Sequence, residues 1–252
     1  MELVNPQKDV NDQSGLRLVP DMSDLLKLPR IEKQFVNFMF VGVSPEWRKL
    51  NADAKAAFKT EFQSVFDAYS NDFLLFSYSL VGFDSKADLM FWRIGSSLDL
   101  VQEMTAKLYR TNLGSYFETA DNYLSVTKKR MFVSKGSEDK FHVIAGGKKY
   151  LFVYPCAKDR DWYEKSGDER DAMIEENFMV GKKFQNIKIH MTHAFGFSDQ
   201  EYIITFETDE PRDFLALAEE LRETPASKFT LRGMPVYTCR QKPLMECLDA
   251  LG

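Results

Sequence analysis

Three side chains in the second half of the sequence have the types and the spacing to bind a ligand. Tyr154, Cys156 and Lys158 stand at alternate positions of a β-rich run over residues 149–158, so a strand there carries all three on one face. A phenol and an ammonium on one face can hold an anionic ligand, and the thiol between them could react or bind a metal. The alternative interpretation is an ordinary strand end with a solvated lysine.

Asn177 is a further candidate, because it is polar where a helix should be apolar. A capping box that starts at Ser166 predicts a helix ending near Gly181. Asn177 shares one stripe of this helix with Met173 and Val180. A buried amide there must find hydrogen-bond partners. The alternative is an asparagine near the helix end that bonds the last turn or a neighbouring loop.

The sequence predicts no metal site. His190 and His193 form an HxxH pattern, but on a strand over residues 186–194 they point to opposite sides and cannot ligate one ion. His142, the third histidine, is expected on a loop or a short strand. The three cysteines show no CxxC spacing, which argues against a zinc knuckle and a disulfide framework.

The composition excludes several classes of protein. A chain of 252 residues with 44% hydrophobic residues can bury one large core, or two halves that share one. The formal net charge of −5 argues against a nucleic-acid partner. No stretch approaches the roughly 18 apolar residues of a membrane span, and the amino terminus lacks the pattern of a signal peptide. We therefore expect a cytoplasmic protein without a membrane partner.

The chain contains an internal repeat. The residues after Trp47 recur at the same offsets after Trp162, and Gly82-Phe83 recurs as Gly196-Phe197. The matched pairs are Asp53 with Asp168, Lys55 with Arg170, Ala57 with Ala172, Phe58 with Met173 and Glu61 with Glu176. A period this long indicates a duplicated domain. At the next offset the copies differ, because Asn177 takes the place of an apolar residue, Phe62.

Each copy predicts the order strand, helix, strand, strand, helix. In the first copy we expect strands over residues 35–43, 72–80 and 87–93, and helices capped by Asn51 and Ser97. In the second copy we expect strands over residues 149–156, 186–194 and 202–207, and helices that begin after Ser166 and at Pro211.

These elements predict an α+β fold of two duplicated ferredoxin-like halves that form one β-barrel flanked by helices. The expected parts are an N-terminal arm over residues 1–30, a first half over residues 31–135 and a second half over residues 136–252. The arm is polar and proline-containing, and we expect little chemistry there.

Several runs resemble the chlorite dismutase superfamily and, within it, the coproheme decarboxylases. They are KADLMFW at 86–92, YLSV at 123–126, YPCAK at 154–158, DWY at 161–163, DER at 168–170 and GFSDQEY at 196–202. The order and spacing of these runs carry the resemblance, which extends from about Phe35 to Cys239. It implies the duplicated barrel, with haem or coproheme in the second half and a homo-oligomer, commonly a pentamer.

The resemblance also implies roles for single residues. In coproheme decarboxylases the ferric coproporphyrin is both cofactor and substrate, and peroxide drives the loss of two propionate carboxylates. Tyr154 matches the tyrosine that becomes the reacting radical, and Lys158 matches a lysine that holds a propionate. Lys140 matches an arginine with a similar role. A lysine at this position keeps the positive charge but cannot bind a carboxylate through two parallel hydrogen bonds, as a guanidinium does.

Two positions depart from that pattern. In the family this helix ends in Glu-His, and the histidine binds the iron. The matching residues here are Glu176 and Asn177, and an amide is a poor ligand for haem iron. The polar distal residue of the family falls on Ile189, although another gap placement brings His190 there. The sequence thus predicts that the conventional axial histidine is absent, and that Met173, Asn177 and Ile189 face the cofactor.

Two functions follow as hypotheses. In the first, the chain binds haem or coproheme through propionate contacts and apolar walls, and carries out peroxide-dependent decarboxylation with Tyr154. In the second, it is a non-haem paralogue that binds another small molecule or a protein partner without catalysis. The motifs around Tyr154 favour the first, which is our prediction, and the simultaneous departures at Asn177 and Ile189 favour the second, which is the alternative. Chlorite dismutation is disfavoured, because in the family it relies on the proximal histidine and a distal arginine.

Overall fold

The structure, a computed structural model, describes residues 34–127, 145–231 and 235–252. The predicted N-terminal arm lies outside these ranges, as do Lys140 and His142. Within them the fold is a mixed α+β fold with eight strands and seven α-helices.

The strands form one closed antiparallel barrel in the order β1-β3-β2-β8-β5-β7-β6-β4. Their bounds are β1 (Phe35–Val43), β2 (Phe73–Ser79), β3 (Leu89–Gly95), β4 (Phe117–Val126), β5 (Tyr150–Cys156), β6 (Lys188–His193), β7 (Tyr202–Thr208) and β8 (Tyr237–Gln241). Four strands come from each half of the chain. The two groups meet at short seams, where β2 pairs with β8 and β4 with β6.

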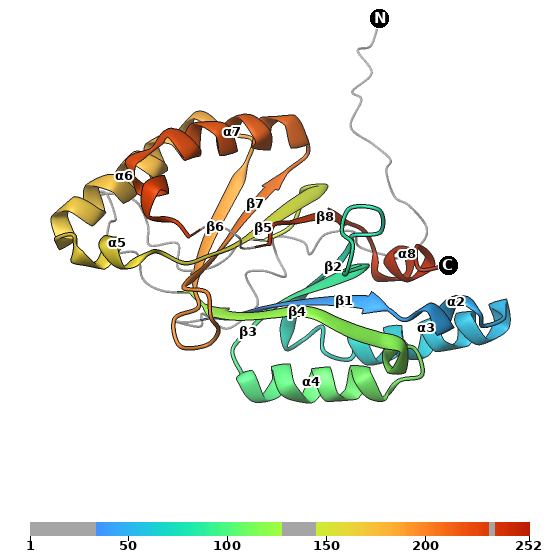
Figure 1. Cartoon of the computed structure of the whole chain (residues 1–252). Coiled ribbons are helices and arrows are strands. Elements are labelled where there is room, and N and C mark those ends of the chain that lie inside the picture. The colour runs from blue at the N-terminus through green and yellow to red at the C-terminus, as the bar shows by residue number, and fades with distance from the viewer. Residues whose placement is uncertain (1–33, 128–144, 232–234) are drawn as a thin grey trace, which may run out of the picture.

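Helices cover the outer face of the barrel in two groups (Figure 1). The α-helices are α2 (Pro45–Arg48), α3 (Ala52–Asp67), α4 (Leu98–Arg110), α5 (Arg160–Glu164), α6 (Gly167–Lys183), α7 (Pro211–Glu223) and α8 (Leu244–Asp249). Two short 3₁₀ helices, η1 (Gly114–Tyr116) and η2 (Pro225–Phe229), follow α4 and α7. Helices α3 and α4 lie on the strands of the first half, and α6 and α7 lie together on those of the second half.

Local sequence signals place the helix starts. The Asn51 side chain accepts a hydrogen bond from the Ala54 amide at 2.8 Å and caps α3, and Ser97 caps α4 in the same way. Ser166 and Glu169 form the expected capping box of α6. Helix α6 continues to Lys183, slightly beyond the predicted end. The predicted strands are confirmed within one or two residues at each end, as is usual for such boundaries.

Alternation along the strands divides the apolar side chains into three layers. One fills the barrel interior, including Phe40, Trp92 and Leu151. A second lies between the first-half strands and α3, α4 and α8, and includes Phe62. The third lies between the second-half strands and α6 and α7, and includes Phe206. Side chains of neighbouring residues therefore enter different layers.

The barrel interior also holds polar side chains. His190 Nε2 lies 3.0 Å from Glu207 Oε1, and the Glu207 side chain is only 1% exposed. The Tyr78 hydroxyl, the Trp92 indole nitrogen and the Thr205 hydroxyl are buried there without a hydrogen-bond partner among the residues that the structure describes. Burial raises the pKa of Tyr78, and the nearby Glu207 carboxylate raises it further. Unpaired buried hydroxyls of this kind cost stability.

We predict that Tyr78→Phe raises the free energy of unfolding by about 1 kcal/mol, because it removes a buried hydroxyl that has no partner. Tyr69→Phe is the matched control, since the Tyr69 hydroxyl bonds Glu103 Oε1 at 2.9 Å and its loss should destabilise the protein. Thermal or denaturant unfolding of both variants measures the effect. A destabilised Tyr78→Phe would show that the hydroxyl is bonded to a buried water.

Candidate functional site

The space between the β5–β7–β6 face and helices α6 and α7 collects the residues that the sequence singled out. We call it the α6–α7 compartment. Its fully buried lining is Phe152, Ile187, Phe206, Phe214 and Leu217. Its half-buried lining is Tyr150, Tyr154, Val180, Phe184, Ile189, Ile204, Ala218 and Leu221. Alternation brings Tyr154 and Ile189 here, as predicted, because both point away from the barrel interior.

The compartment is less completely filled than its counterpart in the first half. Helix α3 buries Lys59, Phe62 and Phe66 against the strands and its neighbours. Helix α6 has a similar length, yet none of its side chains is fully buried. Asn177 stands in α6 where the repeat has Phe62 in α3. A large ring that fills the first layer is therefore missing from the second.

Aromatic rings form the walls of the compartment. Phe152 and Phe214 stack with ring centroids 3.9 Å apart, which joins β5 to α7. The Tyr154 ring meets Phe206 at 5.8 Å and Phe214 at 6.0 Å, both edge to face. Within the described residues the Tyr154 hydroxyl makes no hydrogen bond, so the phenol is held by its ring and keeps its polar end available.

Asn177 places an unsatisfied amide on the same side of α6 as Val180. Its Oδ1 is out of reach of solvent and has no hydrogen-bond partner. Leaving a buried polar group unpaired costs about 1–3 kcal/mol, so such groups are rare in proteins. The sequence analysis considered a bond to the last helical turn as the alternative, and the described residues show no such bond. The amide thus needs a partner that this part of the chain does not supply.

Gly181, one turn beyond Asn177, lies directly on β6. A Cβ atom built on this glycine would stand 3.0 Å from Ile189 Cδ1. The contact holds the end of α6 close to the strand and closes that end of the compartment. Met173 lies one turn before Asn177 and is half-buried. The described structure therefore puts Ile189 near the helix end, and Met173 and Asn177 along the less tightly packed part.

Lys158 lies beyond the end of β5, where the chain turns into α5. Its Nζ donates to the Ala226 carbonyl at 2.7 Å and to Thr230 Oγ1 at 2.8 Å. Nζ also lies 4.7 Å from the centroid of the Trp162 ring. Burial lowers the pKa of the Lys158 ammonium, partly offset by the Cys156 thiol and nearby carboxylates. Two of its three N–H donors are thus bonded within the chain.

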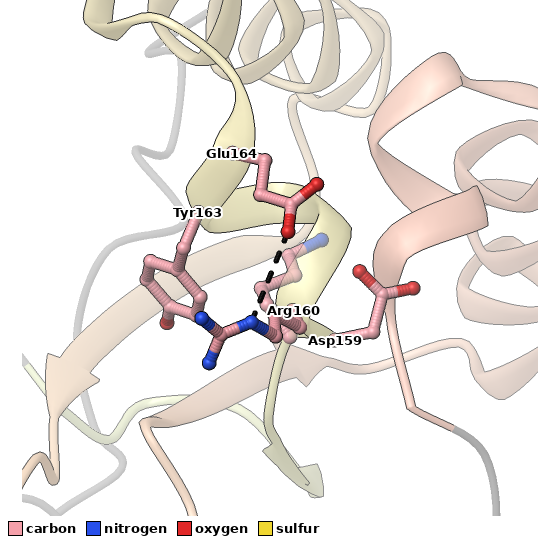
Figure 2. Close-up of a pocket in the computed structure, with 5 residues that line it drawn as sticks. Asp159, Arg160, Tyr163 and Glu164 are labelled. Carbon is pink, nitrogen blue, oxygen red and sulfur yellow. Dashed lines mark ion pairs between the residues drawn. The ribbon is translucent and has the colours of Figure 1, made fainter.

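Lys158 also lines a surface hollow of about 380 Å³ (Figure 2). The other lining residues are Asp159, Arg160, Tyr163 and Glu164. Arg160 Nε lies 3.8 Å from Glu164 Oε1, and the exposed guanidinium keeps donors for another partner. The hollow was not predicted, although Arg160 and Glu164, four residues apart directly after a predicted strand, are a signal for it in the sequence.

Neither described histidine is among the lining residues of the compartment, although His193 lies on the same outer face of β6 as Ile189. His190 points into the barrel interior toward Glu207, and His193 packs against Phe195 and Tyr202. The predicted opposite orientation of these two histidines is confirmed. Among the residues that the structure describes, no group of three or more metal-binding side chains is found.

Cys156 does not present a reactive thiolate. It is buried, and burial raises the pKa of its thiol to about 11, with an opposing effect from Lys158. A thiol with this pKa is almost fully protonated near neutral pH and is a weak nucleophile and metal ligand. The arrangement therefore leaves Tyr150, Tyr154 and Asn177 as polar groups of the compartment among the described residues.

These residues suit the porphyrin ring of a haem better than they suit its iron. Aromatic walls and a helix α6 without a fully buried side chain suit a flat apolar ring. Iron in haem is held by histidine, thiolate, methionine or tyrosine. The unpartnered group beside the compartment is instead a neutral amide, which is a poor ligand for that iron. Tyr154 and Met173 are of types that can bind haem iron, but no described histidine lines the compartment, so the described residues lack the ligand of a conventional haem site.

Comparison with known proteins places the chain in a family. The sequence model described as chlorite dismutase matches residues 55–242. The coproheme decarboxylase of Mycolicibacterium smegmatis is 26% identical over 167 residues, which cover 64% of this chain and 70% of that protein. The chlorite dismutase of Ideonella dechloratans is 21% identical over 241 residues, which cover 92% of this chain and 84% of that protein.

Solved structures share the fold. A variant of chlorite dismutase from Candidatus Nitrospira defluvii superposes with a TM-score of 0.82 at 24% identity, covering 92% of this chain and 99% of that one. A haem-binding protein from Thermus thermophilus gives a TM-score of 0.77 at 20% identity, covering 86% and 94%. No helix in the described residues is long and apolar enough to cross a membrane. Because the family model spans most of the sequence, the chain belongs to the chlorite dismutase family.

Proposed function

We propose that this protein binds a tetrapyrrole in the α6–α7 compartment and does not hold its metal through a side chain of α6. The observation that carries the proposal is the unpartnered buried amide of Asn177 in an under-filled, aromatic-walled layer. Relatives of this chain include a protein described as haem-binding and another described as a coproheme decarboxylase. A flat aromatic ligand would fill the volume that Phe62 fills in the first half.

The hollow at the end of β5 supports the carboxylate end of such a ligand. Arg160 is exposed and can pair with a carboxylate, and Lys158 keeps one N–H for a further bond. We propose Lys158 as a propionate contact, as the resemblance implies. Lys140, the other implied contact, lies outside the described residues.

Other features of the resemblance remain proposals. The same order of elements in both parts of the chain supports two duplicated ferredoxin-like halves, the second over residues 136–252 with the ligand. A homo-oligomer, which is a pentamer in many related proteins, and a cytoplasmic location are predictions from the resemblance and the sequence.

Peroxide-dependent decarboxylation of coproheme is the second candidate function. The unbonded hydroxyl of Tyr154 favours it, since this is the position that matches the reacting tyrosine of that group of enzymes. The amide at Asn177 argues against it. A non-catalytic paralogue that binds an unrelated small molecule or a protein partner is the remaining alternative, and ligand titration separates it from both.

We expect purified full-length protein to shift the Soret absorbance of ferric coproheme saturably at one equivalent per chain, without the spectrum of histidine-ligated iron. The aromatic walls and the cationic end of the compartment account for the binding. A parallel titration with haem, which lacks two propionate carboxylates of coproheme, tests how much those carboxylates contribute to the affinity. A spectrum equal to the sum of free porphyrin and protein would contradict the proposal and favour the non-porphyrin paralogue.

With peroxide added, we expect the complex with ferric coproheme to form no vinyl-bearing product, because α6 supplies no histidine for the iron. Chromatography of the extracted porphyrin with mass detection measures the product. If the product appears and Tyr154→Phe abolishes it, the decarboxylase function is correct. If it appears equally in Tyr154→Phe, the loss of carboxylate does not depend on the phenol.

Asn177→His should give tight binding of haem as a five-coordinate complex, because the imidazole enters the compartment where the amide stands. Asn186→His is the control, since Asn186 is an exposed asparagine just after α6. Absorbance and resonance Raman spectra of the haem-loaded variants report the ligation. Identical spectra for wild type and Asn177→His would show that this position does not face the bound ring.

A further inference from the structure

A second hollow, of about 510 Å³, lies on the first half of the molecule between α3 and α8, which pack against each other (Figure 1). Its lining residues are Ala52, Lys55, Ala56, Lys59, Thr60, Met245, Asp249 and Gly252. We propose that this α3–α8 hollow binds a compact oxyanion, of the carboxylate or phosphate class, on the Lys59 ammonium. The hollow is separate from the α6–α7 compartment, and the proposal does not depend on tetrapyrrole binding.

Lys59 is a charged residue at a buried position of α3, where it is 8% exposed. Lysine is seldom buried to this extent unless its ammonium is paired. In the internal repeat the matching residue is Ile174 of α6, which is exposed. The first copy thus buries a charge where the second exposes an apolar side chain, which is the reverse of what burial energetics favour. Packing alone does not explain a lysine at this position.

The Lys59 ammonium keeps hydrogen-bond donors for a ligand. Its Nζ donates to Asp249 Oδ1 at 3.1 Å, and no other described residue accepts a hydrogen bond from it. Because an ammonium has three N–H donors, two of them remain for a partner in the hollow. The Asp249 side chain is 63% exposed, so its hydrated carboxylate offsets the buried charge only in part. An oxyanion that accepts the two remaining N–H groups completes the pairing.

The rest of the lining favours an anion of small size. Ala52 and Ala56 lie in the first two turns of α3, at the end of the helix that attracts negative charge. Lys55 adds a second ammonium to the lining, and Met245 adds an apolar wall. Gly252 also lines the hollow, and no ion pair joins it to either lysine. The lining side chains therefore carry two positive charges against one negative charge.

The test is a calorimetric titration of the full-length protein with inorganic phosphate and, separately, with acetate, at an ionic strength held constant with chloride. We expect saturable binding with a dissociation constant on the order of 1 mM. The stronger of the two anions identifies the class of ligand. Lys59→Met keeps most of the side-chain stem and removes the ammonium, and it should weaken binding at least about tenfold. Lys49→Met is the matched control, because Lys49 is exposed and pairs with Glu46.

Two further variants separate a binding site from an ion pair that only ties α3 to α8. Asp249→Asn removes the competing carboxylate and should raise the anion affinity about fivefold. A lysine that served only to pair with Asp249 would give lower stability and no gain in affinity. Ala56→Leu fills the hollow without changing its charge and should abolish binding. Ala57→Leu, at an exposed position of α3 outside the lining, should leave binding unchanged.

The proposal is supported if an anion binds saturably, Lys59→Met and Ala56→Leu lose it, and both control variants retain it. It is wrong if neither anion binds to the folded wild-type protein, or if folded Lys59→Met binds as tightly as wild type. An affinity that does not rise in Asp249→Asn also contradicts it, because the lysine donors then do not face the anion. Circular dichroism checks that each variant is folded. None of these outcomes bears on the tetrapyrrole proposal, which the Soret titration tests separately.

Discussion

The pairing of β5, β7 and β6 is the constraint on which the rest of this structure depends. Tyr154 and Met191 both lie opposite Ile204, in continuous antiparallel registers. Each side chain on these strands therefore faces either the barrel interior or the α6–α7 compartment, and a slip by one residue would exchange the two sets. This pairing keeps Tyr154 beside α7 and directs His190 into the barrel, so a phenol rather than an imidazole is available to a ligand.

The two outer layers divide stability from binding. In the first half, α3 inserts Phe62 and Phe66 and packs the layer densely. In the second half, α6 buries no side chain fully and leaves the Asn177 oxygen unpaired. Local packing defects and unsatisfied polar groups are costly, and they persist where binding offsets that cost. The same helix position thus carries a buried aromatic ring in one half and, in the other, the amide that we propose as a ligand contact.

Membership of the chlorite dismutase family fixes the framework of the protein, and its chemistry depends on a few side chains within that framework. The barrel, the helix pairs and the aromatic walls suit a flat ring. Asn177 is the side chain that sets the second half apart from the first, because a neutral amide stands where the repeat has the Phe62 ring. The proposal of a tetrapyrrole ligand therefore depends on what this amide contacts.

The sequence by itself determined six of the eight strands, the four long helices and the faces of their side chains, whereas it did not predict β4 or β8. Caps at Asn51 and Ser166 and alternation around Tyr154 are local patterns, and hydrogen bonds within a few residues are enough to fix them. Only the tertiary structure decided that Lys158 bonds η2, that Gly181 touches Ile189 and that the Asn177 oxygen has no partner. Those facts depend on contacts between segments far apart in the chain, which packing of the whole barrel sets and no local pattern encodes.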